Sequence, residues 1–150
     1  RMQRGSGWAD RKEPARAREK GLTGLPNLGN TCYLNSAMQA LIHIEPFNKF
    51  FLECHGFLPR QDANASIRQQ SQRRLLLSLA DLMSQVWMKG VAVAAPHDFV
   101  REVFELNPDY RGYGQQDSQE FLRRTLDALH EELQEEITPP ANAEEKEDKA

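Results

Sequence analysis

The sequence contains only two cysteines, Cys32 and Cys54, among its 150 residues. Two cysteines are too few for a disulfide framework, and nothing in the composition points to an oxidising compartment, although the sequence alone leaves a Cys32–Cys54 bridge open. No Cys-x-x-Cys pair is present, so the usual spacing of a zinc site is missing, and we expect no metal and no other cofactor in this chain. These features favour a cytoplasmic or nuclear protein.

Long apolar runs and an excess of positive charge are also missing. No apolar stretch approaches the roughly 18–20 residues that a membrane span needs, and the basic N-terminus is not followed by the apolar stretch of a secretory signal. The net charge is −3, which argues against a nucleic-acid binder. Hydrophobic residues make up 39% and charged residues 27%, as in ordinary globular domains, and a chain of this length can bury one sizeable core.

Charge of opposite sign gathers at the two ends of the chain. Residues 1–20 hold seven basic and three acidic side chains and little apolar content, which predicts a basic flexible arm. The last twenty residues hold eight acidic and two basic side chains, and Pro139-Pro140 stops any preceding helix. We therefore predict an acidic disordered tail over 138–150 and a folded part over 21–137. Both charged ends can be explained by solvation alone.

The folded part is predicted to be nearly all helical. Residues 21–30 are rich in glycine, proline and asparagine and predict a loop, whereas 91–95 is only a weak strand pattern. Apolar residues at i, i+3, i+4 and i+7 spacing then predict four helices. The first follows the loop and stops before Pro46, the second covers about 69–88, the third is short and follows Pro96, and the fourth starts near Gln116.

Cys32 lies where the glycine-rich loop becomes the first helix. Unpaired N–H groups and the helix dipole stabilise a thiolate at such a position, which makes the cysteine a good nucleophile. Asn27 offers an amide donor that, together with the Cys32 backbone N–H, could bind the oxyanion of an acyl-transfer intermediate. The plainer interpretation is a small buried cysteine next to an ordinary helix cap, and position alone favours it.

A second polar cluster opens the fourth helix. Asp117 and Glu120 are three residues apart and share a face of the first helical turn, with Gln116 beside them. Acidic residues are common in first turns because they interact favourably with the helix dipole. Without further information this structural explanation is the better one.

The full strings change both interpretations. Residues 21–41, GLTGLPNLGNTCYLNSAMQAL, resemble the cysteine box of the ubiquitin-specific proteases, and GYGQQDSQEF within 111–133 resembles the second box of the same family. The resemblance implies that Cys32 is the catalytic nucleophile and Asn27 the oxyanion amide. It also implies that Gln116, Asp117 and Glu120 bind the arginine-bearing C-terminal tail of ubiquitin. Ubiquitin and ubiquitinated proteins are the implied partners.

The resemblance implies an α+β, papain-like cysteine-protease fold, of which this chain supplies the mostly α-helical, cysteine-bearing thumb lobe. A thiol protease also needs a histidine, and papain-like enzymes place it roughly 130–150 residues after the cysteine. Only 118 residues follow Cys32 here. Neither the family's histidine box nor its zinc-binding fingers is present, and His43 is about 16 Å along the helix from Cys32. We therefore expect the remaining half of the catalytic domain elsewhere and no activity from this chain alone.

Three hypotheses follow. The first is a deubiquitinating thiol protease that hydrolyses the bond after the C-terminal glycine of ubiquitin. The second is a non-catalytic ubiquitin-binding or scaffold fragment, and the third is a helical adaptor unrelated to ubiquitin. The third requires both boxes to be coincidental.

Overall fold

The computed structural model describes residues 19–54, 58, 63–112 and 114–137, and for 135–137 it describes the backbone only. The predicted basic arm and acidic tail fall almost entirely outside these residues. Within them the chain forms five α-helices: α1 (Cys32–Ile42), α2 (Glu45–Cys54), α3 (Ile67–Ser84), α4 (His97–Leu106) and α5 (Ser118–Ile137). A π-helical turn, η2 (Gln85–Lys89), extends α3, and a 3-10 turn, η3 (Pro108–Tyr110), follows α4.

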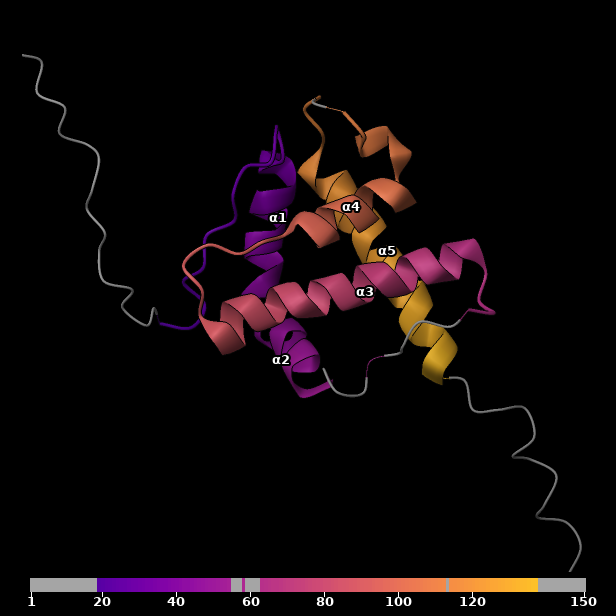
Figure 1. The fold of residues 1–150 in the computed structure, drawn as a ribbon, viewed down its shortest axis with the longest axis horizontal. Helices are drawn as coiled ribbons and strands as arrows, with labels where there is room; N and C mark the ends of the chain where they lie inside the picture. Colours follow the sequence, from indigo (N-terminus) through magenta and orange to yellow (C-terminus); the bar gives the residue numbers. More distant parts are fainter. Residues whose placement is uncertain (1–18, 55–57, 59–62, 113, 138–150) are drawn as a thin grey trace, which may run out of the picture.

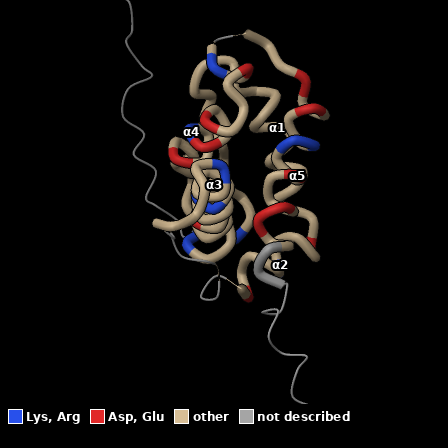
Figure 2. Tube along the Cα trace, turned by 90° about the vertical axis from the view of Figure 1, so that its right-hand side faces the viewer, with Lys and Arg blue, Asp and Glu red and all other residues tan. Residues whose placement is uncertain are grey.

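The helices form two layers. Helix α3 packs against both α4 and α5, and α1 packs against α5 (Figure 1). Figure 2 shows α3 and α4 on one side of the molecule and α1 and α5 on the other. The core between the layers consists of the apolar faces expected from the 3.6-residue periodicity, including Leu34, Met38, Leu75, Leu79, Phe99, Val103 and Phe121.

Charged pairs join α3 to the helices on either side of it. The Arg73 guanidinium lies 2.5 Å from a carboxylate oxygen of Glu132 in α5, and the Glu132 side chain is fully buried. Arg74 pairs with the nearly buried Glu102 of α4 at 2.9 Å. Buried ion pairs of this kind are costly to break one partner at a time, so they restrict how α3 sits between its neighbours.

One helix, α2, was not predicted from the sequence. The first helix was predicted to stop before Pro46, but α1 ends at Ile42 and, after two intervening residues, α2 begins at Glu45, with Pro46 in its first turn. Proline is tolerated there because the first N–H groups of a helix have no intrahelical partner. The i, i+3, i+4 spacing of Phe47, Phe50 and Phe51 was the signal that could have found α2.

The other elements agree with the prediction to within a few residues. Helices α3 and α4 cover the second and third predicted helices, and α5 starts at Ser118 rather than near Gln116. The weak strand pattern at 91–95 contributes one parallel bridge, between Val93 and Gly24 of the N-terminal loop. In the described part of the chain this bridge is the only β-structure. The helical lobe is therefore as expected, and the strand-rich remainder of an α+β fold stays a prediction.

No helix among the described residues is long and apolar enough to cross a membrane.

Candidate active site

Cys32 is the first residue of α1, and its side chain is exposed and not disulfide-bonded. The preceding residue, Thr31, occupies the N-cap position, but its side chain makes no capping hydrogen bond to the helix. Its hydroxyl instead accepts a hydrogen bond from the Leu28 N–H at 3.0 Å. The first N–H groups of α1 therefore keep their capacity to bind a negative charge beside the thiol. Cys54 also has a free thiol, so there is no Cys32–Cys54 bridge.

Asn27 organises the loop in front of the thiol. Its Oδ1 accepts hydrogen bonds from the N–H of Gly29 at 3.0 Å and from the N–H and hydroxyl of Thr31 at 3.2 and 3.3 Å. The turn between them passes through left-handed conformations, with φ +104° at Gly29 and +51° at Asn30. Because these bonds engage only Oδ1, the Nδ2 group is the part of the exposed Asn27 side chain that remains for donating to a ligand.

Asp117 caps α5. Its backbone carbonyl accepts the first intrahelical bond from Phe121, and its Oδ1 accepts the N–H groups of Gln119 and Glu120 at 2.7 and 3.0 Å. Asp117 thus lies one residue before the first turn in which it was predicted, and it acts as an N-cap. The side chain is exposed, and capping uses one of its two carboxylate oxygens.

Glu120 and Gln116 also have partners within the chain. Glu120 pairs with Arg124 at 2.5 Å, one helical turn further along α5. The Gln116 amide donates to the Asp109 carbonyl at 3.3 Å. Arg124 also lies over the ring of Tyr110, 5.7 Å from its centroid. Arg124 was not among the predicted site residues, although its i, i+4 spacing from Glu120 is typical of a helix ion pair.

An aromatic cluster joins the two boxes. Tyr33, next to the candidate nucleophile, lies 5.8 Å from the rings of both Tyr110 and Phe121, and these two rings are 6.2 Å apart. All three side chains are buried, and burial raises the pKa of both Tyr33 and Tyr110. The cluster therefore packs Tyr33, the neighbour of Cys32, against Phe121, the neighbour of Glu120.

None of the histidines in the described residues is paired with the thiol. His43 caps the far end of α1, where one ring nitrogen lies 2.7 Å from the Gln39 carbonyl and the other 2.9 Å from the Gly21 carbonyl. His97 is the first residue of α4, His130 lies in α5, and His55 falls outside the described residues. Within the described chain no histidine hydrogen-bonds to the Cys32 thiol. The same residues also contain no cluster of three or more His, Cys, Asp or Glu side chains fit to hold a metal ion.

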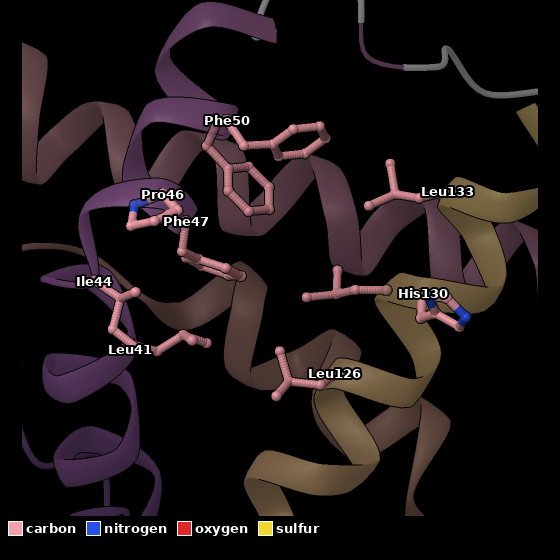
Figure 3. A pocket seen from close by; sticks show the side chains of 10 residues that line it. Leu41, Ile44, Pro46, Phe47, Phe50, Leu126, His130 and Leu133 are labelled. Carbon is pink, nitrogen blue, oxygen red and sulfur yellow. The ribbon is translucent and has the colours of Figure 1, made fainter. Parts of the chain in front are cut away.

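An apolar pocket is separate from this site. It lies between α2 and the second half of α5, has a volume of about 530 Å³, and includes Leu41 and Ile44 from the end of α1 opposite Cys32 (Figure 3). Its lining is almost entirely aliphatic and aromatic, and His130 is the one titratable side chain in it. The pocket therefore contains no cysteine or hydroxyl nucleophile.

Comparison with known proteins agrees with the resemblance noted in the sequence. Residues 23–150 match the family model described as ubiquitin carboxyl-terminal hydrolase. An Arabidopsis thaliana protein whose name is given as ubiquitin carboxyl-terminal hydrolase 11 is 38% identical over 115 residues, which is 77% of this chain and 12% of that protein.

A solved structure shares the fold. It is titled as the SAGA Ubp8/Sgf11/Sus1/Sgf73 DUB module bound to ubiquitin aldehyde, and one of its chains superposes with a TM-score of 0.64 at 21% identity. The match covers 85% of this chain and 27% of the other. The chain thus spans about a quarter of the length of its structural neighbour and an eighth of that of its sequence relative.

Proposed function

Because this chain belongs to the ubiquitin carboxyl-terminal hydrolase family, we propose that it is the nucleophile-bearing part of a deubiquitinating thiol protease. The complete protein would hydrolyse the bond after the C-terminal glycine of ubiquitin in ubiquitin–protein conjugates. The observation that carries the proposal is the exposed Cys32 thiol at the N-terminus of α1, with the Asn27 loop folded directly in front of it.

In the proposed reaction the Cys32 thiolate attacks the carbonyl carbon of the last ubiquitin glycine. The carbonyl oxygen becomes an oxyanion, which accepts hydrogen bonds from the Asn27 amide and from the N–H groups at the start of α1. The tetrahedral intermediate collapses, the lysine amine leaves with a proton, and a thioester remains on Cys32. Water then hydrolyses the thioester and frees the ubiquitin carboxylate and the thiol.

The base that accepts the cysteine proton is a histidine from the remaining part of the catalytic domain. Two observations support this placement. His43 has both ring nitrogens next to carbonyl oxygens at the far end of α1. The matched relatives also extend well beyond the region that this chain covers.

The acidic side chains at the start of α5 would bind the ubiquitin tail. Asp117 and Glu120 would make charge-assisted hydrogen bonds to its arginines, and Gln116 would add a hydrogen bond from the same face. Glu120 offers the tail only part of its carboxylate, because Arg124 already pairs with one oxygen. Asp117 is the more exposed acid, and we expect it to contribute more to binding than Glu120.

A second candidate function is ubiquitin binding without turnover. It is favoured by the lack of any histidine paired with Cys32 among the described residues, since the acidic box could still bind ubiquitin. The two functions differ in one feature outside this chain. A histidine box in the rest of the open reading frame supports the protease, and a stop codon soon after Ala150 supports the binding protein.

An activity-based ubiquitin probe with a C-terminal electrophile tests the protease. We expect the complete protein to be labelled, Cys32→Ser to lose labelling, and the control Cys54→Ser to label as the wild type does. Labelling of Cys32→Ser at the wild-type rate would contradict the proposal.

The double charge reversal Asp117→Arg with Glu120→Arg tests the binding role. We expect weaker ubiquitin binding and unchanged helix content. Unchanged affinity in the complete protein would show that these acids do not bind the tail.

A further inference from the structure

One polar face of α1 binds the segment that leads into the Cys32 loop. Three side chains share this face because they are four residues apart, and each hydrogen-bonds to a backbone carbonyl group of residues 21–26. We call them the polar ladder: Asn35 with Leu25 O at 3.4 Å and Pro26 O at 3.0 Å, Gln39 with Thr23 O at 2.9 Å, and His43 with Gly21 O at 2.9 Å.

The ladder is possible because alternate carbonyls of an extended chain have nearly the same spacing as side chains four residues apart on an α-helix. An extended chain advances about 3.3 Å per residue, so alternate carbonyls are about 6.6 Å apart. Four residues of an α-helix advance about 6.0 Å. Each successive turn of α1 therefore lies beside one of these carbonyls, which belong to Gly21, Thr23 and Leu25. The segment runs antiparallel to the helix, toward its N-terminus.

The opposite side of the segment is bound as well. Gly24 exchanges two backbone hydrogen bonds with 92–94, from its N–H to the Ala92 carbonyl and from the Ala94 N–H to its own carbonyl, each at 3.0 Å. The Thr23 hydroxyl donates to the Val91 carbonyl at 2.7 Å. Up to Gly24, the segment is thus bound on one side by α1 and on the other by residues 91–94. After Gly24, the Asn35 side chain is the member of the ladder that binds the segment next to the Asn27 loop.

We propose that the polar ladder positions Asn27 relative to Cys32, with Asn35 as the decisive positioning residue. Its amide holds the carbonyls of Leu25 and Pro26, the two residues directly before Asn27. Asn27 Oδ1 then holds the Gly29 and Thr31 N–H groups. Asn35 lies on the same helix as Cys32, so this chain of contacts ties the oxyanion donor to the helix that carries the nucleophile. The inference rests on the proposed function only for its catalytic consequence.

The test replaces Asn35 by aspartate. Asn35→Asp has almost the same shape but presents a carboxylate oxygen to two carbonyl oxygens in place of the amide donor. Asn48→Asp is the matched control, because the Asn48 amide donates to the Ile42 carbonyl at 3.4 Å, away from the loop. Asn35→Ala is the second variant, since it removes the donor without adding charge and serves if the aspartate variant folds poorly.

The first measurement is hydrogen–deuterium exchange of the Gly29 and Thr31 amides in the 150-residue chain. We expect at least 10-fold faster exchange in Asn35→Asp and Asn35→Ala, and wild-type exchange in Asn48→Asp. Unchanged exchange in both Asn35 variants would overturn the proposal. This result does not depend on any enzymatic activity.

The second measurement is hydrolysis of a fluorogenic ubiquitin C-terminal amide by the complete protein. Because a small displacement of a catalytic group costs about 100-fold in rate, we expect kcat to fall about 10- to 100-fold in the Asn35 variants with KM within 2-fold of the wild type. An equal loss in Asn48→Asp, or a change confined to KM, would overturn the proposal. A wild-type protein that hydrolyses nothing would instead refute the proposed function, and the exchange experiment would still decide the role of the ladder.

Discussion

Asp117 has two roles that one pair of substitutions can separate. Its Oδ1 caps α5, and its negative charge is proposed to bind the ubiquitin tail. Serine and aspartate are about equally good N-caps, whereas alanine at this position costs about 1 kcal/mol. We therefore expect Asp117→Ser to leave the free energy of unfolding within a few tenths of a kcal/mol of the wild-type value. Asp117→Ala should lower it by about 1 kcal/mol.

The same variants should weaken ubiquitin binding equally. A hydrogen bond to a charged group contributes about 1.5–3 kcal/mol, and the lower end applies because Asp117 is exposed. The corresponding change in Kd is about 10-fold for both variants. Urea denaturation of the 150-residue chain and titration of ubiquitin into the complete protein measure the two effects. Ser66→Ala is the control, since it removes the serine that caps α3 and should lower stability without changing Kd.

The decisive variant is Asp117→Ser. If it folds as the wild type does and also binds ubiquitin with wild-type affinity, the carboxylate has no role beyond capping, and the binding role is refuted. If it loses as much stability as Asp117→Ala, a side-chain cap at position 117 does not stabilise α5.

Two further predictions concern the helices that support the site. Phe121→Ala should lower the free energy of unfolding by about 3–5 kcal/mol, because it leaves a cavity at a fully buried position. Phe50→Ala is the control and should lower it clearly less, because Phe50 is 36% exposed. Equal urea midpoints for the two variants would contradict a stabilising role for the aromatic cluster. Hydrogen bonds from Arg68 and Gln72 hold the pKa of Glu131 below its ordinary value, so the folded state releases this proton more readily than the unfolded state. Glu131→Gln should therefore reduce stability at pH 7 by less than about 1 kcal/mol and converge with the wild type as the pH falls through that lowered pKa; a pH-independent difference between the two would contradict it.

Most helices could be predicted because their apolar residues repeat with the helical period. Leu34, Met38 and Leu41 in α1 and Phe121 and Leu129 in α5 are all buried as expected. Helix α2 was not predicted for a local reason. A proline can lie in the first turn of a helix as well as follow its end, and Pro46 was interpreted only as marking an end. The helical spacing of Phe47, Phe50 and Phe51 was the signal that distinguishes the two cases here.

The residues of the candidate site could be proposed from the sequence, whereas their contacts could not. Cys32 and Asn27 stand in one contiguous motif, and the family comparison confirms the resemblance that this motif carries. The pairing of Glu120 with Arg124 could also have been expected from spacing. The aromatic cluster of Tyr33, Tyr110 and Phe121 could not, because it depends on how three separate elements pack.

By itself, the sequence determined the family, the helical character of this part of the chain and the place of Cys32 at a helix N-terminus. These are local properties, set by residues that are neighbours along the chain. The tertiary structure decided that Asn35, Gln39 and His43 bind the segment in front of α1, because that contact requires an extended chain to lie along a helix. It also decided that both ring nitrogens of His43 face carbonyl groups far from the thiol.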